Sequence, residues 1–100
     1  MSDELVKQPT ESRIYSFDFT HLLDSTETIS TISSIEQVNL GKVSGSTDLT
    51  LGSSAISDKY VQVRISEGTD RENYRLTAII TTSSNNILEM EGILRVRNLL

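Results

Sequence analysis

Apolar and polar residues alternate with a period of two along several stretches of this chain, which is the pattern of half-buried β-strands. The first stretch begins at residue 14 and places three aromatic residues on one face: Tyr15, Phe17 and Phe19. Residues 21–24 then break the alternation and predict a short turn, of 3₁₀ type. Three later stretches show the same alternation, at residues 61–65, 74–81 and 87–97. The pattern therefore predicts a chain built mainly of β-strands.

The last two predicted strands form an antiparallel hairpin. Directly opposed residues must point to the same face, and the inward residues of both strands have even numbers. A three-residue loop over residues 84–86 satisfies this condition and uses two asparagines, which tolerate the left-handed conformation. This register sets Tyr74 opposite Val96, Leu76 opposite Leu94, Ala78 opposite Gly92 and Ile80 opposite Met90.

The stretch from Thr28 to Val43 is harder to assign, because its isoleucines recur every three residues. Threonine and serine dominate it, and these residues favour strands over a helix. A bulge or turn near Ser33–Ser34 would reconcile the spacing with a strand. A short strand is expected at about residues 48–51, and the segment LGKVSG before it reads as a turn, since it lacks the order of a phosphate loop.

About seven short strands separated by Gly, Ser, Asn and Asp predict an all-β fold, an immunoglobulin-like β-sandwich of antiparallel strands over residues 13–100. Residues 1–12 contain Pro9 and no apolar period, and they predict a flexible N-terminal arm. Tyr74 stands at the start of the penultimate strand, where a tyrosine corner would lie. Phe17, Phe19 and Tyr74 are therefore expected to have structural roles.

The composition narrows the possible functions. The 100 residues carry a net charge of −5, and the nine basic residues are scattered, which disfavours direct binding of nucleic acid. A local basic patch stays open if Arg64, Arg75, Arg95 and Arg97 share one sheet face. There is no cysteine, which fits synthesis in a reducing cytoplasm. No run has membrane-spanning length, and no export signal is recognisable.

The residues offer little catalytic chemistry. His21 is the one imidazole, and no cysteine or G-x-S-x-G sequence supplies an activated nucleophile near it. We therefore expect no enzyme activity, no catalytic residues and no cofactor. A calcium site is considered because six acidic residues fall in or near predicted loops, but no calcium-loop motif occurs, so solvated turn residues are the favoured interpretation and no metal is expected. The six are Asp18, Asp24, Glu27, Asp48, Asp58 and Asp70.

Two isoleucines occupy positions where the alternation predicts outward polar groups. In the predicted register Ile79 and Ile93 lie diagonally across neighbouring strands, close enough to form one apolar patch. Charged residues flank them: Arg75, Arg95, Glu89 and Glu91. An apolar centre with a charged rim is typical of a protein–protein interface. These residues are the candidate interface.

The order of motifs resembles a family of small tailed-phage virion proteins, described as fibre–tail adaptor or neck-region proteins. The matching segments are IYSFDFTHLL at 14–23, ETI at 27–29, YVQVRISEG at 60–68, YRLTAIITTSSNN at 74–86 and LEMEGILRVRN at 88–98. Two features depart from the family: Leu22-Leu23 stands where such proteins often have a tryptophan, and Asn85-Asn86 replaces a glycine-containing turn. The resemblance covers most of the chain.

The resemblance implies an immunoglobulin-like domain in a virion, made in the host bacterial cytoplasm. It implies a bridge at the neck or tail, at a head–tail connector or a fibre attachment, in a symmetric multi-copy assembly with phage neck or tail proteins. The family implies no catalytic residues. The alternative from a different class is a ligand-binding β-sandwich for carbohydrate or calcium, and such modules usually expose aromatic platforms.

Overall fold

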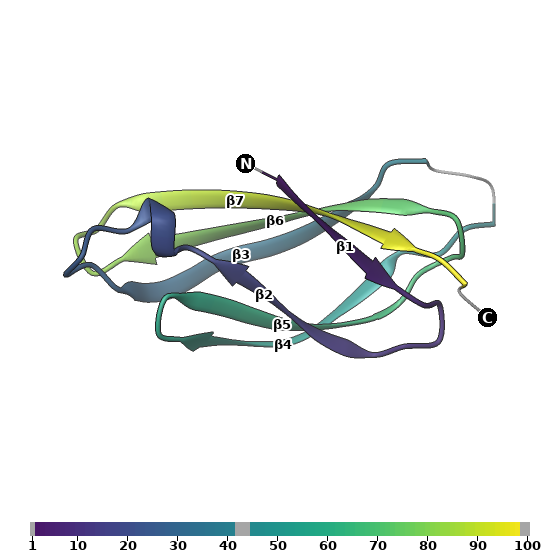
Figure 1. The fold of residues 1–100 in the computed structure, drawn as a ribbon, viewed down its shortest axis with the longest axis horizontal. Helices are drawn as coiled ribbons and strands as arrows, with labels where there is room; N and C mark the ends of the chain where they lie inside the picture. Colours follow the sequence, from purple (N-terminus) through teal and green to yellow (C-terminus); the bar gives the residue numbers. More distant parts are fainter. Residues whose placement is uncertain (1, 42–44, 99–100) are drawn as a thin grey trace.

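The chain folds into two β-sheets packed face to face (Figure 1). A computed structural model describes residues 2–41 and 45–98. The elements are β1 (Ser2–Lys7), β2 (Arg13–Asp18), the 3₁₀ turn η1 (Thr20–Leu22), β3 (Ile29–Asn39), β4 (Leu49–Ser57), β5 (Tyr60–Glu67), β6 (Asn73–Thr82) and β7 (Ile87–Val96). One sheet has the order β1-β7-β6-β3 and the other the order β2-β5-β4. The predicted all-β sandwich of about seven strands is therefore confirmed.

The strand order is close to that of a known class of β-sandwich. Strands β3, β6 and β7 lie together in one sheet and β2, β5 and β4 in the other, which is the order found in immunoglobulin-type sandwiches. The first strand departs from an all-antiparallel arrangement, because β1 runs parallel to β7. The molecule is elongated, with extents of 44 × 22 × 21 Å.

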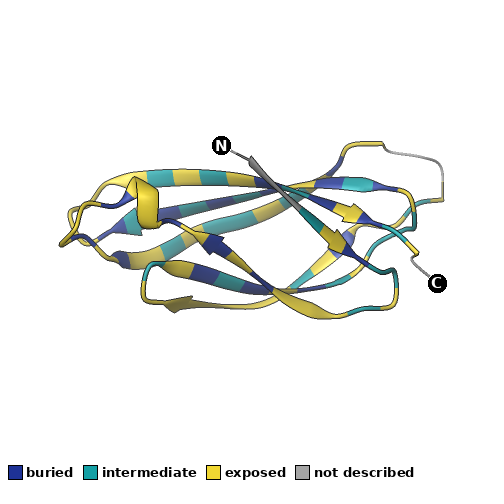
Figure 2. Cartoon of the chain, viewed as in Figure 1, coloured by how far each residue is buried: buried dark blue, intermediate teal, exposed yellow. Residues whose placement is uncertain are grey.

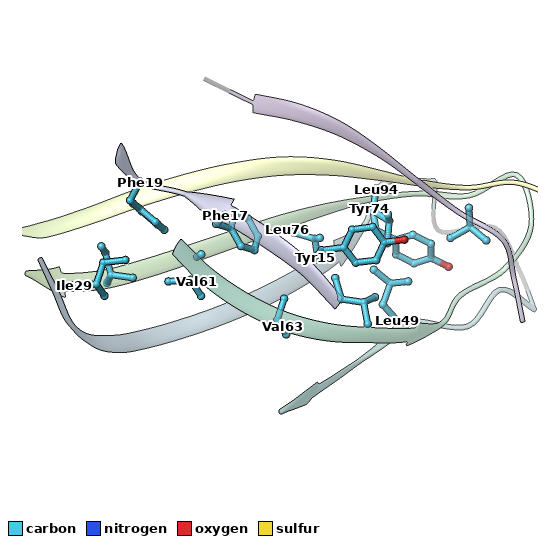
Figure 3. Close-up of a cluster of buried hydrophobic side chains, with 14 of the residues drawn as sticks. Tyr15, Phe17, Phe19, Ile29, Leu49, Val61, Val63, Tyr74, Leu76 and Leu94 are labelled. Carbon is cyan, nitrogen blue, oxygen red and sulfur yellow. The ribbon is translucent and has the colours of Figure 1, made fainter. Parts of the chain in front are cut away.

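The core lies between the sheets and follows the predicted alternation. Tyr15, Phe17 and Phe19 are buried, and Figure 3 shows them among the side chains that fill the space between the two layers. The inward residues of β5 and β6 are also buried: Val61, Val63, Ile65, Tyr74, Leu76, Ala78 and Ile80. Buried positions alternate with half-buried or exposed ones along these strands in Figure 2. Burial of apolar surface stabilises a fold by about 25 cal/mol per Å². This layer is therefore the main source of the stability of the fold.

Strand β3 confirms the prediction for the isoleucine-rich stretch. It is a strand with register shifts between Ile29 and Thr31 and between Ile32 and Ser34. The second shift lies at the predicted bulge, and it restores Ile32 and Ile35 to the side that faces the core. Strand β4 is longer than predicted, since it continues to Ser57 through Gly52. The predicted turn LGKVSG falls partly on residues 42–44, which lie outside the described residues.

The β6–β7 hairpin has the predicted facing but a different register. The structure pairs Tyr74 with Leu94, Leu76 with Gly92, Ala78 with Met90 and Ile80 with Leu88, so the predicted partners are wrong by two residues. The loop is Ser83–Asn85, one position earlier than predicted, because Asn85 takes the left-handed conformation at φ 63°. The third position of such a loop requires that conformation. Asn86 lies just before β7 and is paired with the end of β6, since the Thr82 N–H donates to its carbonyl oxygen at 2.8 Å.

The N-terminal segment corrects a second expectation. Residues 2–7 do not lie apart from the sandwich as an arm but form β1, paired with Glu91–Val96 of β7. Leu5 packs against the core, and Lys7 is fully buried with its ammonium donating to the carbonyl oxygens of Gln8 and Pro9 at 2.7 and 3.1 Å. Burial lowers the pKa of Lys7, and nearby Glu11 opposes this. Because a lysine occupies an inward position of β1, the sequence of this segment does not show the alternation of apolar and polar residues that predicts a strand.

Candidate interaction surfaces

The outer face of the four-stranded sheet carries the predicted interface residues. Opposed residues of β7 and β6 form rows across this face: Ile93 lies opposite Arg75, Glu91 opposite Thr77 and Glu89 opposite Ile79. Arg95 lies opposite Asn73 on β6 and beside Val6 on β1. All the predicted interface residues therefore belong to one sheet face.

The structure does not bring Ile79 and Ile93 together. The observed register places them two rows apart, with the Thr77–Glu91 row between them. Rows on one face are two residues apart, so the two side chains are separated by about 13 Å along the strands. Both are half-buried. The predicted patch depended on a diagonal contact that only the wrong register allows.

A different apolar residue lies on the row of Ile93. Val38 of β3 is opposite Arg75, so Ile93, Arg75 and Val38 form one row across three strands. Val38 is exposed, as is Val6 near Arg95. Sequence reasoning missed Val38, because the bulges in β3 change which of its residues point outward. The pairing of β3 with β6 shows that Val38 lies on the outer face beside Arg75.

The basic residues do not all share this face. Arg64 lies on β5 in the other sheet, where its guanidinium donates to the Ser12 carbonyl and hydroxyl oxygens at 3.1 and 3.3 Å. Arg97 follows β7 and donates to the Asn73 side chain at 2.8 Å. Arg75 and Arg95 remain on the outer face of the four-stranded sheet. The open alternative of four arginines on one sheet face is therefore wrong.

Some of the surface hollows lie beside β4. One, of about 310 Å³, opens between the edges of β3 and β4 and is lined mainly by Ile32, Ile35, Leu51, Ser54 and Val63. Another, of about 200 Å³, lies over the outer face of the three-stranded sheet and includes Ile14, Gln62 and Arg64. The first hollow is lined by aliphatic and hydroxyl side chains and holds no titratable group. Such a lining suits an apolar protein segment better than a charged ligand.

One acidic residue has an environment that the sequence did not reveal. Glu27 is 3% exposed and accepts hydrogen bonds from the Thr82 hydroxyl and, at 2.9 Å, from the Asn86 amide. Its second oxygen accepts from the Asp24 N–H at 3.2 Å. These bonds hold the pKa of Glu27 below its ordinary value of 4.5, with the Thr82 bond the largest cause. Glu27 therefore joins the β2–β3 connection to the β6–β7 hairpin.

The remaining candidate metal and catalytic residues lie at the end of β2, in η1 or in the connections between strands. Asp18 accepts from the Thr20 N–H at 2.9 Å at the start of η1, and this bonding lowers its pKa. His21 is exposed within η1, and Asp70 accepts from the Asn98 N–H at 2.8 Å. Within residues 2–41 and 45–98, no three acidic or imidazole side chains gather in a way that could hold a metal ion.

The chain is a small β-sandwich, and its candidate interaction surfaces are the faces and edges of its two sheets. Comparison with family models gives a match to the Podophage GP4 fiber-tail adaptor protein gp77 family over residues 7–95. The chain belongs to this family. The match begins at Lys7, the last residue of β1, and ends at Arg95 in β7, so it covers β2 to β6 and nearly all of β7. A search of curated proteins gives no match.

The family assignment confirms the resemblance to phage adaptor proteins that the sequence motifs indicated. It leaves the predicted interface residues as predictions, because a family description assigns no role to Ile79, Ile93 or their charged neighbours. In the parts of the chain that the structure describes, no helix has the length and apolar character needed to cross a membrane.

Proposed function

We propose that this chain is a structural adaptor of a phage virion that joins tail and fibre components through protein–protein contacts and catalyses no reaction. The observation that carries the proposal is the family match over residues 7–95, which spans nearly the whole sandwich. The adaptor acts at the tail, in several symmetric copies made in the host bacterial cytoplasm. A closed ring of copies is the usual way to attach parts around a tail axis.

The outer face of the four-stranded sheet supports this role as one of the two contact surfaces that an adaptor needs. Its row of Ile93, Arg75 and Val38 combines apolar contact area with a cation, and Glu91 and Arg95 flank the row. Arginine beside aliphatic residues is typical of interface centres, and charged neighbours form the rim. An apolar row with charged neighbours suits a protein partner better than a small substrate.

The proposal is tested by the composition of virions assembled without this protein. We expect particles that retain their tail proteins and lose the fibre protein, measured by quantitative mass spectrometry of gradient-purified particles. Complementation with the wild-type gene should restore the fibre protein. Particles that keep the fibre protein at wild-type amounts would contradict the adaptor role, and clear binding of calcium or simple glycans by calorimetry would then favour a ligand-binding module.

The contact surface is tested separately by substitution. Ile93→Asp and Ile79→Asp should each lower incorporation into particles, since a buried carboxylate at an interface is costly to desolvate. Ile87→Asp is the matched control, because Ile87 also lies on β7 but is 73% exposed at the end of the hairpin. If Ile93→Asp and Ile87→Asp variants are folded and enter virions equally well, this face is not the contact surface.

A further inference from the structure

The four sheet edges differ in how well they are protected. An edge strand presents unpaired N–H and C=O groups, and proteins blunt such edges with charges, proline, bulges or short length. Strands β1 and β2 are six residues each and carry charges. Strand β3 has two register shifts and Glu36. Strand β4, LTLGSSAIS, has nine residues, one register shift, and neither a charge nor a proline. Among the seven described strands, β4 alone carries no charged residue.

The second half of β4 also lacks cover on its inward side. Ser54 and Ile56 lie opposite Val63 and Val61, so they point toward the other sheet as those buried valines do. Ser54 is nevertheless exposed and Ile56 is 39% exposed. The hollow between β3 and β4 opens beside them. Figure 2 shows β4 as exposed along most of its length. The backbone edge of β4 and the inward side chains of its second half, Ser54 and Ile56, are therefore available to a partner.

The absence of charged residues from β4 indicates which kind of partner this edge suits. A two-fold axis places each residue of an edge strand near residues of an identical strand, so a charged strand would meet like charges at short range. With a net charge of −5, two copies repel one another except where their contact is neutral. A partner of opposite charge would gain nothing from an uncharged edge. Strand β4 is neutral, and it is therefore suited to a second copy of itself.

We propose that two copies of the chain associate through β4, antiparallel about a two-fold axis, and so join their three-stranded sheets into one continuous sheet. Main-chain hydrogen bonds between the two β4 strands stabilise the contact, and Ile56 gains cover from the inward residues of the other copy. The outer faces of both four-stranded sheets stay free for other partners. This inference does not rest on the adaptor role, because self-association in solution is independent of virion composition.

The test measures the mass of the full-length chain by sedimentation over a range of concentrations. We expect a dimer, and we expect Ser54→Lys to raise its dissociation constant by at least about tenfold, because it adds an ammonium group to each copy near the middle of the paired strands. Ser16→Lys is the matched control, since Ser16 is an exposed serine on β2, the opposite edge of the same sheet. Hydrogen exchange should show β4 amides protected in the wild type and in the Ser16→Lys variant, and less protected in the Ser54→Lys variant.

Circular dichroism establishes that each variant is folded, and Ala55→Lys replaces Ser54→Lys if the latter is not. Ala55 is exposed on the same edge. A wild-type chain that stays monomeric, or a dimer that tolerates lysine at both positions, overturns the proposal. Protection of β4 amides that appears only after a tail or fibre protein is added also overturns it, and it would assign this edge to that partner.

Discussion

At the scale of single residues, Tyr74 joins three parts of the chain. Its side chain is fully buried, its hydroxyl donates to the Thr47 carbonyl oxygen at 2.5 Å, and it accepts from the Thr69 N–H at 3.0 Å. The bond to Thr69, a few residues upstream, makes this the tyrosine corner that the sequence predicted. The bond to Thr47 was not predictable, because no local pattern links residues that far apart.

Tyr74→Phe should therefore destabilise the fold by about 1–3 kcal/mol, since it leaves two backbone groups without their partner. Urea unfolding followed by circular dichroism measures this. Tyr15→Phe is the control, because the Tyr15 hydroxyl makes one longer bond, to the Val6 carbonyl oxygen at 3.2 Å. Equal losses of unfolding free energy in the two variants would show that the hydrogen bonds of the Tyr74 hydroxyl stabilise the fold no more than the single bond of Tyr15.

Glu27 gives the stability a defined pH dependence. Its pKa is lowered in the folded chain, so the stabilisation it contributes is present above its ordinary value of 4.5 and is lost as the pH falls through the lower folded pKa. Glu27→Gln removes this titration, and its Tm should fall less than that of the wild type between about pH 5 and pH 3. Parallel pH profiles for the two proteins would contradict the proposed role of the carboxylate.

At the scale of elements, the sequence predicted what depends on alternation and missed what depends on long-range contacts. The facing of β2, β5, β6 and β7 and the bulge in β3 follow from residue order. The register of the β6–β7 hairpin does not, because two adjacent asparagines both suit its loop. The Asn86 side chain donates to Glu27, which is far away in the sequence, and this contact favours the observed position of Asn86 beside β7. The predicted isoleucine patch failed with that register.

The β5–β6 connection depends on Gly68, whose φ is +97°. A Cβ there would lie 2.8 Å from Leu49 Cδ2 and 3.0 Å from Val96 Cγ2. Gly68→Ala should cost about 2 kcal/mol or more, from backbone strain together with core overpacking. Gly45→Ala is the control, because Gly45 also has positive φ but has open space around it. Chemical denaturation measures the free energy of unfolding of both variants. Equal losses of stability would show that backbone strain alone accounts for the cost and that overpacking adds nothing.

Strand β1 provides a test of the corrected N-terminus. Deleting residues 1–11 removes the β1–β7 ladder and the buried Lys7, so we expect the Tm to fall by more than about 5 °C. Calorimetry measures the change. A Tm that stays the same would restore the interpretation of these residues as an arm that orders only against a neighbour.

At the scale of the whole molecule, the sequence motifs were sufficient to predict the family and the sandwich. They could not predict which surfaces meet partners, because outward positions contribute little to folding and therefore leave a weak pattern. Val38 and the β4 edge became visible only when the ladders placed them beside Arg75 and at the margin of the sheet. The contact surfaces that we propose therefore depend on which residues the strand pairing places side by side.

A structural adaptor must be a stoichiometric part of the virion. The most direct measurement is quantitative mass spectrometry of gradient-purified wild-type particles, calibrated against tail proteins of known copy number. We expect a small, fixed copy number that is commensurate with the symmetry of the tail. Absence of the chain from purified particles, with the protein present in the infected-cell lysate, would contradict it.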